Sequence, residues 1–280
     1  MRAEFVSSRG LAGWVAGSGP EVVLLHGGPG MSDYMESLLP ELGGYRVASF
    51  QQRGVAPSTL DGPYDVPTLR DDALDVFDTL GWKAPAVIGH SWGGHLLLHL
   101  LAAAPARVGA ALVVDPLGAV GDGGLAELDA EVDRRLPTRV TARLRELDAL
   151  AEARALTPAE VQESLDLAWP AYFSSLEAAQ PIPQTGHAPS AETWASIRAE
   201  MPRLAERLRG CTVPTRFVHG ERDPMPLTAS TDTAEILGAP VDVLPGDGHF
   251  CWLEDPGCVR RSLDRLLSSP RAAGPTSAGG

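Results

Sequence analysis

The residues that could most clearly do chemistry in this chain are Gly89-His90-Ser91-Trp92-Gly93, which have the form G-x-S-x-G. The apolar residues 86–88 precede the motif and a leucine-rich segment follows it, so the serine sits at a predicted strand-to-helix turn. Such a turn is so tight that side chains at its outer positions would collide with the backbone, and glycine occupies both. It holds the serine in a strained conformation with an exposed hydroxyl. Ser91 is the predicted nucleophile; the alternative is a glycine-rich turn with an idle serine.

A serine hydroxyl is a poor nucleophile near neutral pH and needs a base, for which the chain offers 7 histidines. His249 is the predicted base, because it lies in a glycine-rich turn directly after the last predicted strand. His95 and His99 are four residues apart on a predicted helix, but no third metal ligand is visible and packing or solvent contact is expected there. The other histidines fit the role of base less well: His26, His90, His187 and His219.

A carboxylate is needed to fix the tautomer of the base and to stabilise its charged form. Asp223 follows a predicted strand and precedes a proline, so it lies in a turn between the nucleophile and the base along the chain. Glu221 and Asp247 are the rivals, but Glu221 is too close to the strand end and Asp247 is only two residues from His249. The predicted triad is therefore Ser91, Asp223 and His249.

Short apolar runs and helical segments alternate in the parts of the chain that must hold this triad. Apolar runs bounded by turns suit strands that are buried on both faces, and they occur at 4–6, 11–15, 22–25, 46–50, 86–88, 110–114, 216–219 and 241–244. Helical patterns cover 67–80, 91–103 and 258–267. This alternation predicts an α/β fold with a mostly parallel central sheet and helices on both faces.

The middle of the chain has a different pattern. Residues 116–209 contain helical segments at 138–155 and 192–209, a capping box at Thr157 to Glu160 that starts another helix, and a loop around 181–186. We interpret this block as a helical cap inserted in the sheet domain. The predicted division is a core at 1–115 and 210–267, a cap at 116–209, and a disordered tail at 268–280.

Composition limits the classes of partner. The net charge of −13 disfavours nucleic acid and anionic membranes, although an acidic pocket could select a cationic substrate. The 3 cysteines form no Cys-x-x-Cys pair, so neither a disulfide framework nor a zinc knuckle is expected. With no signal peptide or membrane span in evidence, the expected location is cytoplasmic. The oligomeric state cannot be inferred from the sequence.

A second glycine-rich motif, His26-Gly27-Gly28-Pro29-Gly30, follows the third predicted strand. Together with the serine turn, Asp223 and His249 in this order, it resembles the α/β-hydrolase superfamily with a helical cap, over about residues 1–267. The resemblance implies an oxyanion hole made by the backbone N–H groups of Gly28 and Trp92. The alternative for the motif is a tight turn. No metal and no organic cofactor are expected.

Two segments are similar to the prolyl iminopeptidase branch of that superfamily. They are the His-Gly-Gly-Pro-Gly loop with Ser-Trp-Gly, and Phe50-Gln51-Gln52-Arg53-Gly54, in which Gln51 stands where that branch usually has aspartate. The motif Gly-His-Ser-Trp-Gly-Gly is closer to general esterases. That branch binds the free amino group of its substrate with carboxylates, and the predicted cap holds Glu163, Asp166 and Glu177, none in a motif that aligns.

The expected function is that of a serine hydrolase, which cleaves a small ester, lactone or amide through an acyl-enzyme on Ser91. A prolyl aminopeptidase releasing N-terminal proline is the first alternative, and a non-catalytic ligand-binding protein on the same fold is the second. The substrate would be a small molecule or a short peptide. Trp169, Tyr172 and Phe173, in the predicted cap, could line its pocket or belong to the core.

Overall fold

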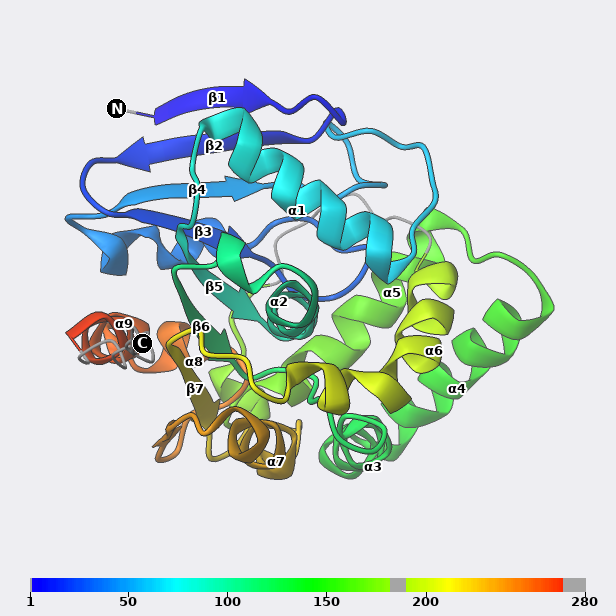
Figure 1. Ribbon diagram of the computed structural model, residues 1–280. Helices are drawn as coiled ribbons and strands as arrows, with labels where there is room; N and C mark the ends of the chain where they lie inside the picture. Colours follow the sequence, from blue (N-terminus) through cyan, green and yellow to red (C-terminus); the bar gives the residue numbers. More distant parts are fainter. Residues whose placement is uncertain (1, 182–189, 269–280) are drawn as a thin grey trace, which may run out of the picture.

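The computed structural model describes residues 2–181 and 190–268, so the predicted loop residues 182–186, His187 and residues 269–280 of the predicted tail lie outside it. In the described part, eight strands form one sheet, and helices cover it (Figure 1). All the neighbouring strands pair in parallel except at one edge, where the hairpin β1–β2 is antiparallel and β2 runs antiparallel to β4. The predicted mostly parallel α/β sheet is confirmed.

The strand order is β1-β2-β4-β3-β5-β6-β7-β8. The strands are β1 (Arg2–Val6), β2 (Ala12–Gly17), β3 (Glu21–Leu25), β4 (Arg46–Phe50), β5 (Ala86–His90), β6 (Ala110–Val114), β7 (Thr215–Gly220) and β8 (Val241–Leu244). Every residue of β6 is buried, as expected of a strand covered on both faces. Because parallel strands end at the same edge of a sheet, the residues that follow β3, β5, β6, β7 and β8 come together there.

Helices on the two faces of the sheet form two separate cores. The helices are α1 (Val66–Leu80), α2 (Trp92–Ala103), α3 (Leu125–Arg135), α4 (Thr138–Ala153), α5 (Pro158–Ala168), α6 (Ala191–Leu208), α7 (Leu227–Leu237), α8 (Cys251–Glu254) and α9 (Cys258–Ser268). The 3-10 helices are η1 (Met35–Leu42), η2 (Pro105–Arg107), η3 (Trp169–Tyr172) and η4 (Leu176–Ala178). Helices α1, α2, α6 and α7 bury their apolar side chains in one core, and η1, α8 and α9 do so in the other.

The helix boundaries follow the local signals in the sequence. Helix α1 begins after Asp65, whose side chain accepts a hydrogen bond from the backbone of Thr68, and it ends at Gly81 in the left-handed conformation. The capping box at Thr157 is confirmed at the start of α5. Helix α7 and the short helices η1 and α8 have no counterpart in the sequence-based prediction.

The segment between β6 and β7 contains α3 to α6, which lie together at one side of the sheet in Figure 1. The described residues of this segment contain no strand. Helix α6 also packs on the sheet domain, because Ile197, Met201 and Leu204 belong to the same core as the leucines of α2. The division into a core and a cap at residues 115 and 209 therefore stays a prediction.

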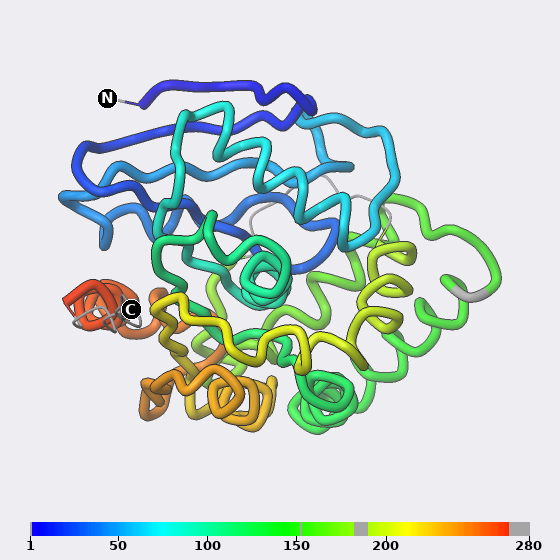
Figure 2. The backbone as a smooth tube through the Cα atoms, in the orientation of Figure 1, coloured from blue at the N-terminus to red at the C-terminus, as the bar shows by residue number. Residues whose placement is uncertain are grey.

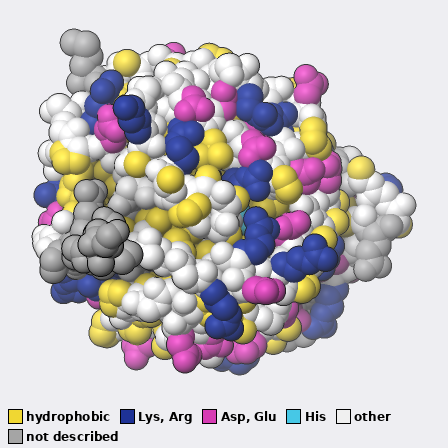
Figure 3. Space-filling model, viewed as in Figure 1, with side chains coloured by type: hydrophobic (Ala, Val, Ile, Leu, Met, Phe, Trp, Pro, Cys, Tyr) yellow, Lys and Arg dark blue, Asp and Glu magenta, His cyan; other side chains and the backbone are white. Residues whose placement is uncertain are grey.

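The backbone starts at the upper edge of the molecule with β1 and passes through the segment α3–α6 on the right before it ends with α9 on the left (Figure 2). On the face shown in Figure 3, basic and acidic side chains are interspersed. Within the described residues, none of the helices combines the length and the apolar character that a membrane crossing requires.

Candidate active site

Ser91 lies at the turn between β5 and α2, immediately before the first residue of the helix. Its φ of 56° and ψ of −122° are unusual for a residue other than glycine, as predicted for a strained serine. The backbone N–H of Ser91 donates a hydrogen bond of 2.9 Å to the carbonyl of Val114, which ties the turn to the end of β6. The turn thus holds the serine in place by its backbone, and leaves the side chain free to react.

The two glycines of the motif allow close backbone packing. A Cβ atom on Gly89 would lie 2.4 Å from the carbonyl oxygen of Gly93. A Cβ atom on Gly93 would lie 2.0 Å from the carbonyl oxygen of Leu25, at the end of β3. The serine turn therefore sits against the strand that leads into the His26–Gly30 loop, and a side chain at either glycine would push the two apart.

His249 and Asp223 lie together although they are 26 residues apart in the chain. The Nδ1 atom of His249 is 2.8 Å from Oδ2 of Asp223, and both side chains are buried. Oδ1 of Asp223 accepts a second hydrogen bond of 2.8 Å from the backbone of Met225. With Nδ1 protonated and donating to Asp223, Nε2 of His249 is the nitrogen that is free to accept a proton.

Burial controls the charge of this pair. Burial lowers the pKa of His249 to about 3, so the imidazole is neutral near pH 7. Burial raises the pKa of Asp223 above its usual value, and hydrogen bonds from neighbouring groups together with the charge of Arg135 offset only part of this rise. A neutral histidine beside a carboxylate is the state in which a histidine can act as a base.

The two rival acids are not in contact with the base. Glu221 is exposed, and its Oε2 accepts a hydrogen bond from the backbone of Gly246. Asp247 is partly exposed, and its pKa is raised by burial and by the nearby Asp255 and Glu254. Of the three acids that the sequence proposed, Asp223 is the one that has a hydrogen bond to His249.

Gly28 and Trp92, the predicted oxyanion donors, both line a cavity that Ser91 also lines. Gly28 and Ser91 line a second cavity as well. Gly28 has a φ of 57°, and Trp92 is the first residue of α2, where a backbone N–H has no acceptor within its own helix. The indole of Trp92 donates a 3.0 Å hydrogen bond to Oε1 of Gln52. Gln52 in turn donates from Nε2 to the carbonyl of His26, at 2.8 Å. This bond fixes the loop His26–Gly30, called the glycine loop below, relative to α2.

A buried chain of hydrogen bonds, which the sequence did not suggest, connects the glycine loop to the loop of the base. The backbone of Gly27 donates to the hydroxyl of Tyr34 at 2.8 Å, and this hydroxyl donates to Nδ1 of His90 at 2.6 Å. Nε2 of His90 then donates to the backbone carbonyl of His249 at 2.8 Å. Burial keeps the pKa of His90 well below its usual value, so its ring remains a neutral link. Tyr34 had no motif that would reveal this role.

Two cavities meet at Ser91, His249, Gly28 and Tyr172. The larger, of about 400 Å³, is bounded mainly by apolar side chains and by two charged residues, Asp129 and Arg198. The smaller, of about 120 Å³, is bounded by Met31, Tyr34, Leu165, Ala168, Trp169 and Phe250. Such apolar hollows with few polar groups are typical of sites for small molecules.

The three aromatic residues predicted for the pocket divide between the cavities and the core. Tyr172 lines both cavities and Trp169 lines the smaller one. Phe173 lines neither and is fully buried in the core, with its ring 5.3 Å from that of Phe250. Of the two alternatives that the sequence left open, pocket and core, Phe173 takes the core, because its backbone packs against Gly248 and its side chain is fully buried there.

The cap acids named from the sequence do not line these cavities. Both carboxylate oxygens of Glu163 accept hydrogen bonds from Arg143, and Asp166 accepts one from Gln162. Glu177 lies in the first turn of η4. Asp129 of α3 does line the larger cavity, and its pKa is raised by burial and by the charges of Asp148, Asp133 and Asp122.

His95 and His99 are buried and bonded to each other, as the packing interpretation expected. Their Nε2 atoms are 3.2 Å apart, and Nδ1 of His95 donates to the carbonyl of Leu117 at 3.2 Å. His99 is therefore the donor within the pair. Burial lowers the pKa of His95 to about 4, so both rings are neutral at pH 7.

Among the described residues, Asp115, His219 and Asp223 could offer a metal three ligand atoms, all within 4.8 Å of one another. They fit a metal poorly, because most of these atoms already have protein partners. The ring nitrogens of His219 are bonded to the Ser230 hydroxyl and to the carbonyl of Met225, at 2.9 and 3.1 Å. Asp223 is bonded through both oxygens.

Comparison with known proteins agrees with this architecture. The chain matches the alpha/beta hydrolase fold family over residues 20–256 and therefore belongs to that family. The solved structure of a proline iminopeptidase-related protein from Thermus thermophilus superposes with a TM-score of 0.65 at 23% identity, over 95% of this chain and 96% of that one. At this identity the likeness is one of fold.

Two curated relatives are hydrolases by name. A protein named as a carbamate hydrolase, RutD, from Variovorax paradoxus (strain S110) is 28% identical over 268 residues, 91% of this chain and 94% of the relative. The AB hydrolase superfamily protein YfhM from Bacillus subtilis (strain 168) is 34% identical over 117 residues, which span 38% of this chain and 40% of that protein. Family and relatives together support an enzyme of the hydrolase class.

Proposed function

We propose that this protein is a serine hydrolase that cleaves a small ester, lactone or amide through an acyl-enzyme on Ser91. The observation that carries the proposal is the meeting of Ser91 and His249 in the walls of two cavities, with Nδ1 of His249 only 2.8 Å from Asp223. Ser91 lines both cavities, and the larger one, of about 400 Å³, has the volume of a typical site for a small organic molecule.

In the proposed reaction, the Ser91 hydroxyl attacks the substrate carbonyl while Nε2 of His249 takes its proton. Asp223 holds the tautomer of His249 and stabilises the imidazolium that forms. The backbone N–H groups of Gly28 and Trp92 bind the negative oxygen of the tetrahedral intermediate. His249 then gives its proton to the leaving group, and a water molecule activated by the same base releases the acid and frees Ser91.

A fluorophosphonate probe tests the nucleophile. We expect it to label the wild-type protein covalently and not the Ser91→Ala variant, because the probe reacts with an activated serine hydroxyl. His249→Ala should also lose labelling, since the hydroxyl is then not activated. Mass spectrometry of the labelled peptide identifies the residue. No labelling of the wild type, or equal labelling of Ser91→Ala, would refute the proposal.

A prolyl aminopeptidase is the second candidate, and Asp129 is the observation that favours it. Its carboxylate lines the larger cavity beside Tyr172, where it could bind the free amino group of a substrate. Burial raises its pKa, and so does the negative charge of Asp148, Asp133 and Asp122; this charge favours a cation at the same place. Turnover of proline-β-naphthylamide faster than that of p-nitrophenyl acetate would favour this candidate over the esterase.

A further inference from the structure

The mechanism proposed for Ser91 makes no use of Asp115, although this acid lies beside the triad. Asp115 directly follows β6, has a φ of 45° and is fully buried. Its Oδ1 accepts a 2.8 Å hydrogen bond from the backbone of Gly220, but its Oδ2 is buried without a hydrogen-bond partner. An unpaired carboxylate oxygen in the interior is unfavourable, and this one requires a physical explanation.

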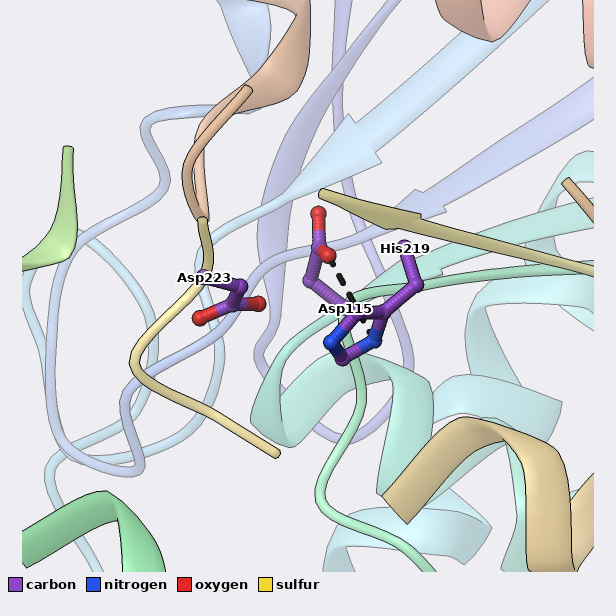
Figure 4. Close-up of side chains that lie close together, drawn as sticks. All are labelled: Asp115, His219 and Asp223. Atoms are coloured by element: carbon purple, nitrogen blue, oxygen red, sulfur yellow. Dashed lines mark ion pairs between the residues drawn. The ribbon is translucent and has the colours of Figure 1, made fainter. Parts of the chain in front are cut away.

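The groups that surround Asp115 come from several elements. Figure 4 shows its side chain between His219, at the end of β7, and Asp223, in the loop that follows. His219 lies 3.7 Å from Oδ1 through its Nδ1 atom. The thiol of Cys251 and the hydroxyl of Tyr34 also face this region, and the charge of Arg135 acts on Asp223.

None of these neighbours gives Asp115 a counter-charge. His219 donates from Nε2 to the carbonyl of Met225, so Nδ1 carries no proton and accepts from Ser230. Burial lowers the pKa of His219 to about 4, and the ring is therefore neutral. Tyr34 gives its proton to His90, and a thiol such as that of Cys251 is only a weak donor.

Two carboxylates that are buried side by side do not both ionise. Asp223 is the acid whose ionised form is better stabilised, because it accepts hydrogen bonds from Met225 and His249 and has the charge of Arg135 nearby. Asp115 has one fixed donor, the N–H of Gly220, and burial together with Asp223 raises its pKa well above the usual value. The proton therefore belongs on Asp115.

We propose that Asp115 is a positioning residue: it is a neutral carboxylic acid that donates a hydrogen bond from Oδ2 to the carboxylate of Asp223. The proposal rests on the proposed role of Asp223 in the triad. A protonated Oδ2 gives the unpaired atom its partner and explains why two acids can share an interior with no cation between them. It also gives Asp223 a further donor, which keeps it anionic and orients it toward His249.

Two substitutions at position 115 test whether the residue acts as a hydrogen-bond donor, which the first keeps and the second removes. Asp115→Asn keeps an acceptor for Gly220 and replaces the acidic proton with an amide donor, whereas Asp115→Gly removes the donor. Both asparagine and glycine tolerate a positive φ, so neither change strains the backbone. We expect Asp115→Asn to retain kcat/KM within about 3-fold and Asp115→Gly to lose about 10- to 100-fold, as for a lost hydrogen bond to a charged group.

The pH profile shows whether the residue acts through Asp223. The hydrogen bond from Asp115 lowers the pKa of Asp223, so Asp223 in Asp115→Gly takes up a proton at higher pH. Activity needs an anionic Asp223, and the acidic limb of kcat/KM should therefore move to higher pH in Asp115→Gly and stay in place in Asp115→Asn. Equal damage in both variants, or a loss of thermal stability without any movement of this limb, would overturn the proposal.

A measurement independent of turnover separates this proposal from the proposed function. The infrared band of a neutral carboxylic acid should be present in the wild type at pH 7 and absent in Asp115→Asn, whether or not the protein hydrolyses any substrate. If the band is absent from the wild type, the proposal fails. Loss of activity with a chelator, restored by a divalent cation, would also overturn it, because the three residues would then bind a metal.

Discussion

Replacing Gly93 by alanine tests how tightly the serine turn packs against the sheet. The new Cβ atom would lie 2.0 Å from the carbonyl oxygen of Leu25 and 2.6 Å from that of His26. Real Cβ contacts are essentially never under 3.0 Å, so the two backbones must separate by about 1 Å. No rotamer change can relieve this clash, since both neighbours are backbone atoms.

The expected effect has two parts. Overpacking in a core costs about 1–3 kcal/mol, and here the cost should reach the upper part of that range because Leu25 is held in register by Gly89 of β5. A displacement of about 1 Å between Ser91 and the glycine loop should lower kcat/KM about 100-fold. Urea unfolding and ester hydrolysis measure the two parts.

Gly43→Ala is the matched control for this substitution. Its Cβ atom would have no neighbour within 4 Å, and its φ of −55° suits alanine. The control should change the free energy of unfolding by less than about 1 kcal/mol, and in the stabilising direction if at all. If Gly93→Ala has the stability and the activity of the wild type, the packing argument for the serine turn is refuted.

Two further predictions concern buried and cavity-lining charges. The pKa of His95 is about 4 in the folded protein and near 6.5 when unfolded, so the unfolded chain takes up the proton first as the pH falls. Between pH 7 and 5 this histidine should cost about 2 kcal/mol of stability, a loss that His95→Gln should lack in urea unfolding; equal pH sensitivity of the two proteins would contradict this. Asp129→Asn should lower kcat/KM for substrates with a free amino group about 3- to 10-fold relative to neutral esters, since a charged hydrogen bond is lost at a site open to water. A constant ratio of the two substrates would exclude Asp129 from amine binding.

The parts of the site that local chemistry determines were predictable from the sequence. Gly89 and Gly93 have to be glycine within a five-residue turn, so the motif alone indicates the strained Ser91. Asp223 and His249 follow strands and lie in turns. The distance of Asp223 from the strand end and from His249 distinguished it from Glu221 and Asp247, and the position of His249 after the acid favoured it over the other histidines. Each of these signals is readable without knowledge of which strands are neighbours.

Other features depend on packing between distant segments. Asp115 reaches Asp223 only because β6 and β7 are adjacent in the sheet, which no local pattern reveals. Tyr172 and Phe173 are neighbours in sequence, yet one faces the cavities and the other the core. Helix α7 begins Leu-Thr-Ala-Ser-Thr-Asp-Thr, which has no apolar stripe, and it forms because its small residues Ala229 and Ala234 pack against the sheet core.

The division of the site into two cavities, each with its own lining residues, has a consequence for how this protein could change over evolution. The groups proposed for the chemistry follow strands of the sheet, whereas Leu165 and Ala168, which bound the smaller cavity, belong to α5. Exchanges at these two positions would enlarge or fill one side of the site and leave the backbone around Ser91 unchanged. New substrates could thus be acquired one cavity at a time, without rebuilding the machinery that breaks the bond.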